Sequence, residues 1–265
     1  MRLMLTIALA SQKGGTAKTT SAVNLAAALV LTGSRVLLCD LDAQASATLW
    51  LTDNYGPKGR TVRDVLKRDA KIQECIVHTR PGIDLLPANL WLSSLGIEML
   101  SAYRKEERLG SALDTVAAQY DFCLIDCPPS LELATVNAFT ACRTCVIPID
   151  CRAQALLCVP QLLEVLVGIS TEFGEPIGVY ALPTFFERTN LARDIVSQIE
   201  EQFEAATLPP IHKNTRLAEA FVSRQTIFEY DSTALGAVDY KRVARELYDD
   251  LTPTTRLRRR TEEAG

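Results

Sequence analysis

The residues with the clearest chemistry lie between 11 and 20, where the sequence reads SQKGGTAKTT. An apolar run precedes this segment and an Ala/Leu-rich run of helical period follows it, which is the setting of the phosphate-binding pattern G-x-x-x-x-G-K-[ST]. Ala17 replaces the second glycine of that pattern, whereas Lys18 and Thr19 match its lysine and hydroxyl. The segment predicts a phosphate site in which Lys18 reaches the β- and γ-phosphates and Thr19 binds Mg²⁺. Because the second glycine is missing, a simple turn beside a helical lysine is the open alternative.

Three aspartates follow apolar runs farther along the chain. Asp40 and Asp42 lie in the segment DLDAQ at the end of the second run, and Asp126 ends a later run, before CPPS. In a parallel sheet with helices on both faces, ligands bind outside the carboxyl ends of the strands. We therefore expect the three carboxylates to meet the phosphate loop in one pocket for Mg²⁺ and a nucleotide. For Asp126 taken alone, an N-cap of the following helix is the alternative role.

Apolar runs of strand length alternate with longer segments of helical period along the whole chain. This alternation predicts an α/β fold, a single doubly wound and mainly parallel sheet flanked by helices. The expected strands are residues 3–10, 35–40, 83–87, 122–126, 144–149 and 177–182, with a short extended piece at 208–211. The expected helices are residues 18–31, 98–120, 131–141, 160–173, 191–205, 215–223 and 235–251.

Length and composition narrow the class of protein. The chain has 265 residues, 48% of them apolar and 23% charged, which excludes an intrinsically disordered or collagen-like protein. We expect one domain over residues 1–251 and a basic, flexible tail over 252–265. The first apolar run is too short for a signal peptide, and no run approaches the ~20 residues of a membrane span, so we expect a cytoplasmic protein with reduced thiols. The net charge of −4 means that any nucleic-acid binding would need a local basic face.

Together these motifs resemble those of the deviant Walker A ATPases, and most closely those of the ParA/Soj partition branch. The resemblance covers nearly the whole chain. It implies a P-loop NTPase fold of the deviant Walker A type, ATP and Mg²⁺ as cofactors, and an ATP-sandwich homodimer in which Lys13 reaches phosphates across the interface. The matching segments are KGGTAKTT at 13–20, DLDAQ at 40–44, IDCPPS at 125–130, RTNL at 188–191, NTRLAEA at 214–220 and EYD at 229–231.

The resemblance also implies a role for each matching residue. The catalytic residues would be Lys13, Lys18 and Asp42. The two lysines would neutralise charge on the transferred phosphoryl group, and the aspartate would orient the attacking water. The Mg²⁺ ligands, partly through water, would be Thr19, Asp40 and Asp126. The loop residues around the nucleotide phosphates would be Gly14, Gly15, Thr16, Ala17, Lys18, Thr19 and Thr20.

Ala17 departs from the family pattern, in which glycine is usual. If this position needs a positive φ, the Cβ atom costs roughly 1–2 kcal/mol. If it is an ordinary first-turn position, alanine is harmless and favours the helix. We expect the ordinary first-turn conformation at Ala17.

Nonspecific double-stranded DNA is the polymer that relatives bind, through basic residues on the dimer. A few phosphate contacts would give weak, salt-dependent binding without sequence readout. For each residue alone, a solvated surface side chain is the alternative. The matching positions and their neighbours are Arg188, Arg193, Lys213 and Arg216.

The expected function is therefore a slow ATPase that dimerises on ATP and binds the nucleoid. A ParB-like or cargo-adaptor protein would stimulate hydrolysis, and the cycle would position a plasmid, a chromosome or a protein complex such as carboxysomes. No membrane partner is expected, because the C-terminal arginines lack the apolar face of an anchor helix. Two alternatives stay open: a metal-cluster carrier using the C-x-x-C pair Cys142 and Cys145, and a nucleotide-binding scaffold with little turnover.

Overall fold

A computed structural model describes residues 4–52, 59–152 and 156–252. Its strands are β1 (Leu5–Leu9), β2 (Val36–Asp40), β3 (Val77–His78), β4 (Ile83–Leu86), β5 (Phe122–Asp126), β6 (Thr144–Asp150) and β7 (Gly178–Thr184). They form one seven-stranded sheet in the order β3-β4-β2-β5-β1-β6-β7. Every described pair is parallel except β3 with β4. Parallel neighbours align their carboxyl ends, so β1, β2, β5 and β6 deliver their last residues to one edge.

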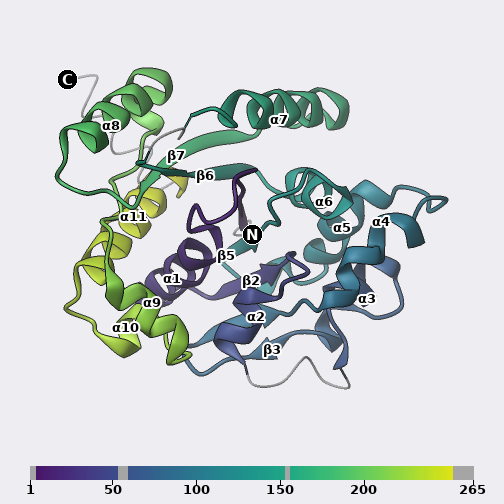
Figure 1. Cartoon of the computed structure of the whole chain (residues 1–265). Helices are drawn as coiled ribbons and strands as arrows, with labels where there is room; N and C mark the ends of the chain where they lie inside the picture. Colours follow the sequence, from purple (N-terminus) through teal and green to yellow (C-terminus); the bar gives the residue numbers. More distant parts are fainter. Residues whose placement is uncertain (1–3, 53–58, 153–155, 253–265) are drawn as a thin grey trace, which may run out of the picture.

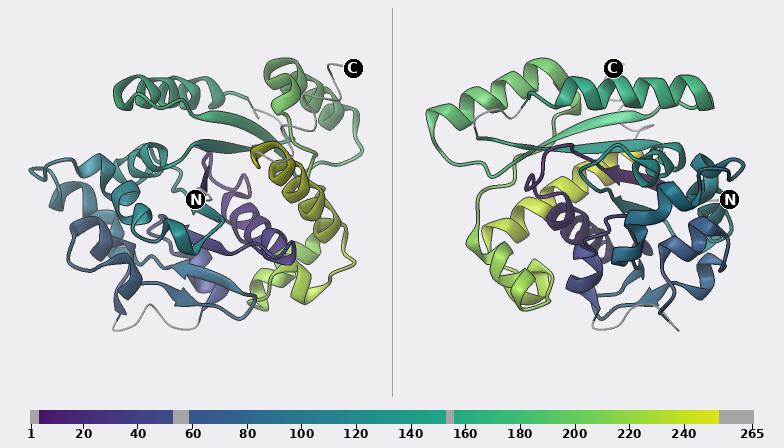
Figure 2. Two further views of the ribbon diagram at one scale, coloured as in Figure 1. Left: turned by 180° about the vertical axis from the view of Figure 1, so that it is seen from behind. Right: turned by 45° about the vertical axis from the view of Figure 1, so that its right-hand side comes forward.

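Helices connect the strands. The α-helices are α1 (Lys18–Leu31), α2 (Ser46–Leu51), α3 (Val62–Lys67), α4 (Leu95–Glu98), α5 (Arg108–Asp114), α6 (Leu133–Ala141), α7 (Val159–Phe173), α8 (Asn190–Phe203), α9 (Thr215–Val222), α10 (Ile227–Tyr230) and α11 (Leu235–Leu251). Short 3₁₀ turns are η2 (Ile72–Glu74), η3 (Leu90–Ser94), η4 (Lys105–Glu107), η5 (Ala117–Gln119) and η6 (Glu204–Ala206). Figure 1 shows α1, α9, α10 and α11 on one side of the central strands and α3 to α6 on the other. In both views of Figure 2, α7 and α8 lie along the β7 edge of the sheet.

Two apolar cores fill the space between the sheet and these helices. Along β5, Phe122 and Leu124 face the core beneath α1 and α11, whereas Cys123 and Ile125 face the core beneath α5, α6 and α7. This alternation with period two is what a strand buried on both faces requires. A buried hydrogen bond of 3.0 Å between the hydroxyls of Ser21 and Tyr240 joins α1 to α11. The site described below therefore rests on a sheet packed on both faces.

The predicted α/β fold is confirmed. The six predicted strands, and every predicted helix but one, match described elements to within two residues at each end. The extended piece at 208–211 forms no strand of its own. Isolated β-bridges lie on either side of it: Thr207 pairs with Ala181 of β7, and His212 pairs with Phe186. Residue 3 and the tail at 253–265 lie outside the described residues.

The predicted helix at 98–120 is wrong. The chain instead forms α4, η4, α5 and η5. Arg104, before η4, has a left-handed backbone conformation with φ of 48°, which interrupts the helix. The apolar stripe is still mostly buried, but Tyr103 is 83% exposed. The break has a tertiary cause: the Asn137 side-chain amide of α6 donates to the Lys105 carbonyl (2.9 Å), and its oxygen accepts from Leu109 N–H (3.0 Å). These contacts replace the backbone bonds of a continuous helix.

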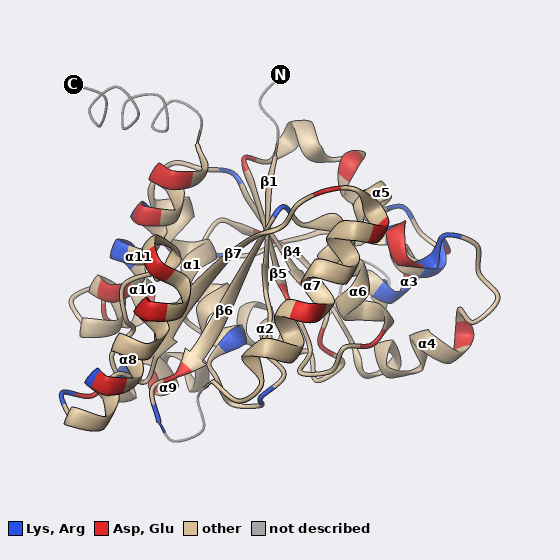
Figure 3. Cartoon of the chain, turned by 90° about the horizontal axis from the view of Figure 1, so that it is seen from above, with Lys and Arg blue, Asp and Glu red and all other residues tan. Residues whose placement is uncertain are grey.

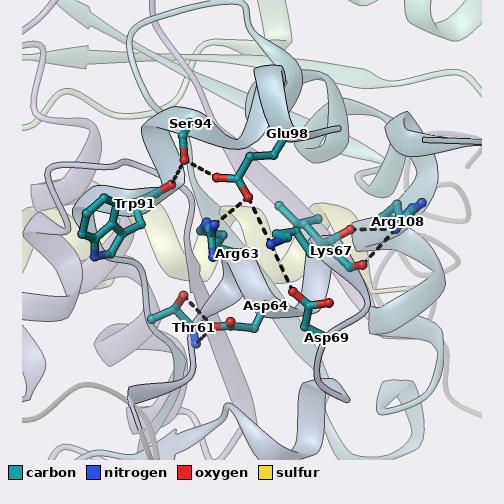
Figure 4. A network of polar contacts seen from close by, with 10 residues as sticks. Thr61, Arg63, Asp64, Lys67, Asp69, Trp91, Ser94, Glu98 and Arg108 are labelled. Carbon is teal, nitrogen blue, oxygen red and sulfur yellow. Dashed lines mark hydrogen bonds and ion pairs between the residues drawn. The ribbon is translucent and has the colours of Figure 1, made fainter. Parts of the chain in front are cut away.

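A polar network fixes α3 against α4 in this region. Glu98 of α4 accepts from Arg63 (2.5 Å) and lies 3.1 Å from the Lys67 ammonium, and Ser94 donates to its other oxygen (Figure 4). These contacts hold the pKa of Glu98 down at about 2, with the Arg63 hydrogen bond as the largest cause. α4 is thus anchored by ionic contacts rather than by continuation of a longer helix.

Candidate functional site

The phosphate loop runs from the end of β1 to the start of α1. Gly15 has φ of 73° and Ala17 has φ of 68°, so both lie in the left-handed region. The expectation of an ordinary first-turn conformation at Ala17 is therefore wrong. Ala17 is the N-cap of α1, and its carbonyl accepts the first helical bond from Ser21 N–H at 2.8 Å. The loop curvature requires a backbone that glycine adopts without strain, and alanine here carries the cost of its Cβ atom.

The space beside the two glycines of this loop is open. A Cβ atom added at Gly14 or Gly15 would meet no atom within 4 Å. From behind, the Thr184 hydroxyl of β7 donates to the Thr16 carbonyl at 3.2 Å. The loop is therefore supported from the sheet while its glycines border free space, as a cradle for phosphates requires.

Lys18 lies at the base of the cradle and is only 7% exposed. Its ammonium donates to the Lys13 carbonyl at 3.4 Å, and Thr16 Oγ1 donates to the same oxygen at 3.4 Å. Burial lowers the pKa of Lys18, and the charges of Asp126 and Asp42 act in the opposite direction. A buried ammonium of this kind is stabilised by a nearby anion.

Two of the predicted aspartates meet at the carboxyl edge. Asp40 and Asp126 are register partners at the ends of β2 and β5, and both side chains are fully buried. Asp40 accepts from Asp42 N–H (3.1 Å) and from both the N–H (2.9 Å) and hydroxyl (2.8 Å) of Thr48. Burial raises the pKa of Asp40 to about 6 in spite of these donors.

Asp126 differs from its neighbour. Among the described residues, neither of its carboxylate oxygens has a partner within normal hydrogen-bond geometry. Burial raises the pKa of Asp126 well above its usual range, and Asp40 adds to this rise; the nearby Thr19 hydroxyl and the Lys18 charge act against it. A buried carboxylate without a donor, beside a threonine hydroxyl, fits a divalent cation or its bound water.

Asp42 and Thr20 complete the predicted set. Asp42 lies half-buried beyond β2, where one of its oxygens accepts Gln44 N–H at 2.9 Å. Its charge acts on the Lys18 ammonium, so the two groups lie within electrostatic range of each other. Thr20 lies in the first turn of α1, and its carbonyl accepts from the Asn24 amide at 2.8 Å.

One buried acidic residue at this edge was not predicted. Asp150 ends β6 and is 2% exposed. Its carboxylate binds the Arg152 guanidinium and lies 3.6 Å from the Lys13 ammonium. The signal that could have found it is the one that marks Asp40 and Asp126, an aspartate that ends an apolar run.

Of the four predicted DNA-binding residues, Arg188 and Lys213 lie in the loops after β7 and before α9, Arg193 lies in α8 and Arg216 lies in α9. Arg188, Arg193, Lys213 and Arg216 are all exposed. The structure brings the Arg188 and Lys213 loops together through a bond from Lys213 N–H to the Phe186 carbonyl (3.0 Å). Lys213 pairs with Glu187 (3.1 Å) and Arg216 with Glu219 (2.8 Å). Figure 3 accordingly shows acidic residues beside basic ones around α8 and α9.

The cysteine pair Cys142 and Cys145 is fully buried. Burial raises the pKa of Cys142 to about 12, which disfavours the thiolate that metals bind. In residues 4–52, 59–152 and 156–252, no three His, Cys, Asp or Glu side chains are grouped to hold a metal ion. The geometry thus gives no support to a metal cluster on this pair.

None of the helices in residues 4–52, 59–152 and 156–252 is long and apolar enough to cross a bilayer.

Comparisons with known proteins agree with this geometry. The family model described as "AAA domain" matches residues 4–177. The sporulation initiation inhibitor protein Soj of Bacillus subtilis is 36% identical over 245 residues, 91% of this chain and 97% of that protein. The chromosome partitioning protein ParA of Caulobacter vibrioides is 34% identical over 250 residues, 91% of this chain and 92% of that protein.

A solved structure is similar in both fold and sequence. Cobyrinic acid a,c-diamide synthase from Mycobacterium smegmatis, with a bound ATP analog and magnesium, superposes with a TM-score of 0.81 at 31% identity. The match covers 92% of this chain and 93% of that one. With its phosphate loop, its buried aspartates and these relatives, the chain belongs to the ParA/Soj family of partition ATPases, of the deviant Walker A type.

Proposed function

We propose that this chain binds ATP with Mg²⁺ at the phosphate loop and hydrolyses it slowly. The observation that carries the proposal is Asp126, a fully buried carboxylate near Thr19 and Lys18 that has no hydrogen-bond donor in the part of the chain that the structure describes. Thr19 and Asp126 would hold Mg²⁺, partly through water, and Asp40 would support them from the neighbouring strand. The metal ion would offset phosphate charge and compensate the buried carboxylates.

The remaining loop residues would act on the phosphates. Lys18 would neutralise charge on the transferred phosphoryl group while the backbone N–H groups of 14–20 surround the phosphates. Asp42 would accept a hydrogen bond from the attacking water and orient it. It would act as an orienting group for the water rather than as a strong base.

We further propose that residues 1–251 act as one ATPase domain that forms an ATP-sandwich homodimer, with Lys13 reaching the partner's nucleotide. The dimer would bind nonspecific double-stranded DNA through Arg188, Arg193, Lys213 and Arg216, and so associate with the nucleoid in the cytoplasm. A ParB-like or cargo-adaptor protein would stimulate hydrolysis and release. The cargo would be a plasmid, a chromosome or a protein complex. Support comes from the family and from the exposure of the four basic residues.

Hydrolysis is tested with Asp42→Ala, and Asp69→Ala in an exposed turn after α3 is the matched control. ATP turnover is measured with DNA and with candidate partner proteins. The proposal expects turnover in the wild type and in the control, and loss of about 10²-fold or more in Asp42→Ala. Absence of turnover in all proteins, with nucleotide binding intact, would favour the scaffold alternative, for which the strained Ala17 is the structural argument.

DNA binding is tested by mobility shift with ATP, with ADP and without nucleotide, at two salt concentrations. The proposal expects binding that requires ATP and weakens steeply with salt. Arg188→Ala should weaken it, whereas Arg143→Ala, directly before β6 at the opposite edge of the sheet, should not. Binding that ignores ATP would contradict the proposal.

A further inference from the structure

Asp150 binds two cations at the end of β6. Arg152 donates from Nε to one carboxylate oxygen (2.7 Å) and from Nη2 to the other (2.6 Å). The Lys13 ammonium lies 3.6 Å from the second oxygen. This carboxylate is buried, yet it belongs to neither the Asp40–Asp126 pair nor the Asp42 segment.

The contact with Asp150 decides where the Lys13 side chain goes. In the sheet order, β6 lies on one side of β1, and β5 and β2 lie on the other. Lys13 therefore extends toward β6, away from the Asp40–Asp126 pair. It borders a small hollow of about 10 Å³, which is also lined by Ile149, Val159 and Leu162. The ammonium is held within its own subunit, at the edge of its own phosphate loop.

The two cations are not held equally. The Arg152 guanidinium makes a bidentate contact and lies 4.6 Å from the centre of the Phe185 ring. Lys13 makes one longer contact, and its side chain is 37% exposed. Paired, planar contacts of arginine with a carboxylate are the stronger kind. Lys13 can therefore leave Asp150 without leaving a buried carboxylate unpaired, which would be costly.

We propose that Asp150 is a positioning residue that holds Lys13 within its own subunit until a second copy brings a nucleoside triphosphate to it. On dimerisation, Lys13 exchanges the carboxylate for phosphate oxygens of the partner's nucleotide, and Arg152 remains on Asp150 as its counter-ion. The ion pair between Asp150 and Lys13 opposes dimerisation in the absence of nucleoside triphosphate. This inference rests on the proposed ATP-sandwich function of Lys13.

The test compares two variants that should act in opposite directions. Asp150→Asn removes the hold on Lys13, so ATP-dependent dimerisation should tighten by about two- to fivefold, the range of an exposed ion pair. Arg152→Gln leaves Lys13 as the only described cation on Asp150, so dimerisation should weaken by a similar factor. Sedimentation with ATP and Mg²⁺ measures both constants. A structural defect would weaken dimerisation in both variants, which would overturn the proposal.

Two further arms separate this inference from the proposed function. In the Lys13→Gln background, Asp150→Asn should have no effect on dimerisation. If Asp150→Asn still tightens dimerisation in that background as it does in the wild-type background, the proposal is overturned. In the nucleotide-free monomer, reductive methylation of Lys13 should be faster in Asp150→Asn and slower in Arg152→Gln, with Lys213 as the unchanged reference. If the wild type does not dimerise with ATP, the proposed function fails, while the methylation rates still confirm or overturn the hold on Lys13.

Discussion

Asp40 and Asp126 lie opposite each other at the ends of β2 and β5, but among the described residues only the Asp40 carboxylate has hydrogen-bond partners. Asp40 accepts from Thr48, whose hydroxyl in turn accepts Ala88 N–H at 2.9 Å. This chain of bonds ties β2 to α2 and to the residues after β4. One aspartate is therefore held by hydrogen bonds within the protein, and the other has no such bond among the described residues. Substitutions at the two positions should have opposite consequences.

Asp126→Asn should stabilise the metal-free protein. The pKa of Asp126 is raised in the folded state, so at neutral pH folding must either bury a charge or take up a proton, and asparagine does neither. We expect the free energy of unfolding to rise by about 1–3 kcal/mol in EDTA at pH 7.5, measured by urea denaturation. The added stability that Mg²⁺ with ADP confers on the wild type should be lost.

Asp40→Asn is the matched control for that experiment. Asparagine keeps only one acceptor oxygen, so its amide NH2 group must face either the two Thr48 donors or the Asp42 N–H, and buried donors are left poorly paired. We expect a loss of about 1–3 kcal/mol. If both variants destabilise the metal-free protein equally, Asp126 has a hydrogen-bond role that the geometry does not contain.

Glu98→Gln should destabilise the protein at neutral pH but not at low pH. Arg63, Ser94 and Lys67 hold the pKa of Glu98 at about 2 in the folded protein, below its ordinary value of 4.5. A lowered carboxyl pKa stabilises the folded state above pH 4.5, and this contribution disappears as the pH falls from 4.5 toward 2. The difference in melting temperature between wild type and variant should thus be larger at pH 7 than at pH 3. Glu172→Gln, at an exposed position of α7, should show no such change.

Asn137→Ala tests the cause of the break between α4 and α5. The buried Asn137 side chain donates to the carbonyls of Lys105 (2.9 Å) and Leu133 (3.0 Å) and accepts from Leu109 N–H (3.0 Å). Removing it leaves these backbone groups without that partner, and we expect a loss of about 2–3 kcal/mol in urea denaturation. Ser111→Ala, on the exposed face of α5, should change stability by less than about 0.5 kcal/mol. A near-neutral Asn137→Ala would mean that local sequence breaks the helix.

The strands, the phosphate loop and the Asp40–Asp126 pair could be predicted because each depends on short-range pattern. An apolar run of strand length followed by an aspartate puts the carboxylate at the carboxyl edge wherever the strand sits in a parallel sheet. The same pattern marks Asp150, but its significance depends on Lys13, 137 positions earlier, and on the strand order that makes β6 a neighbour of β1. Local pattern carries no information on that order.

The errors in prediction also have tertiary causes. The apolar stripe over 98–120 is real, since Met99, Leu109 and Val116 are buried. Side chains of α6 bind the backbone between them, and no pattern within 98–120 reveals those contacts. At Ala17 the residue type favours a helix, yet the phosphate loop imposes φ of 68°. There the path of the backbone overrides the preference of the residue.

Ala17→Gly should therefore stabilise the protein, although the change places glycine directly before a helix. Alanine in the left-handed region costs roughly 1–2 kcal/mol of stability, which glycine would recover. Glycine itself costs roughly 0.5–1 kcal/mol, because the unfolded chain gains conformational entropy. The net expectation is a gain of about 0.5–1 kcal/mol in the free energy of unfolding, measured without nucleotide. Ala22→Gly, in the buried interior of α1, is the control and should lose at least about 1 kcal/mol. Equal losses in the two variants would show that Ala17 is not strained. If the predicted gain appears, the same variant should also bind Mg²⁺ and nucleotide at least as tightly as the wild type, because its loop no longer works against the side chain at its N-cap.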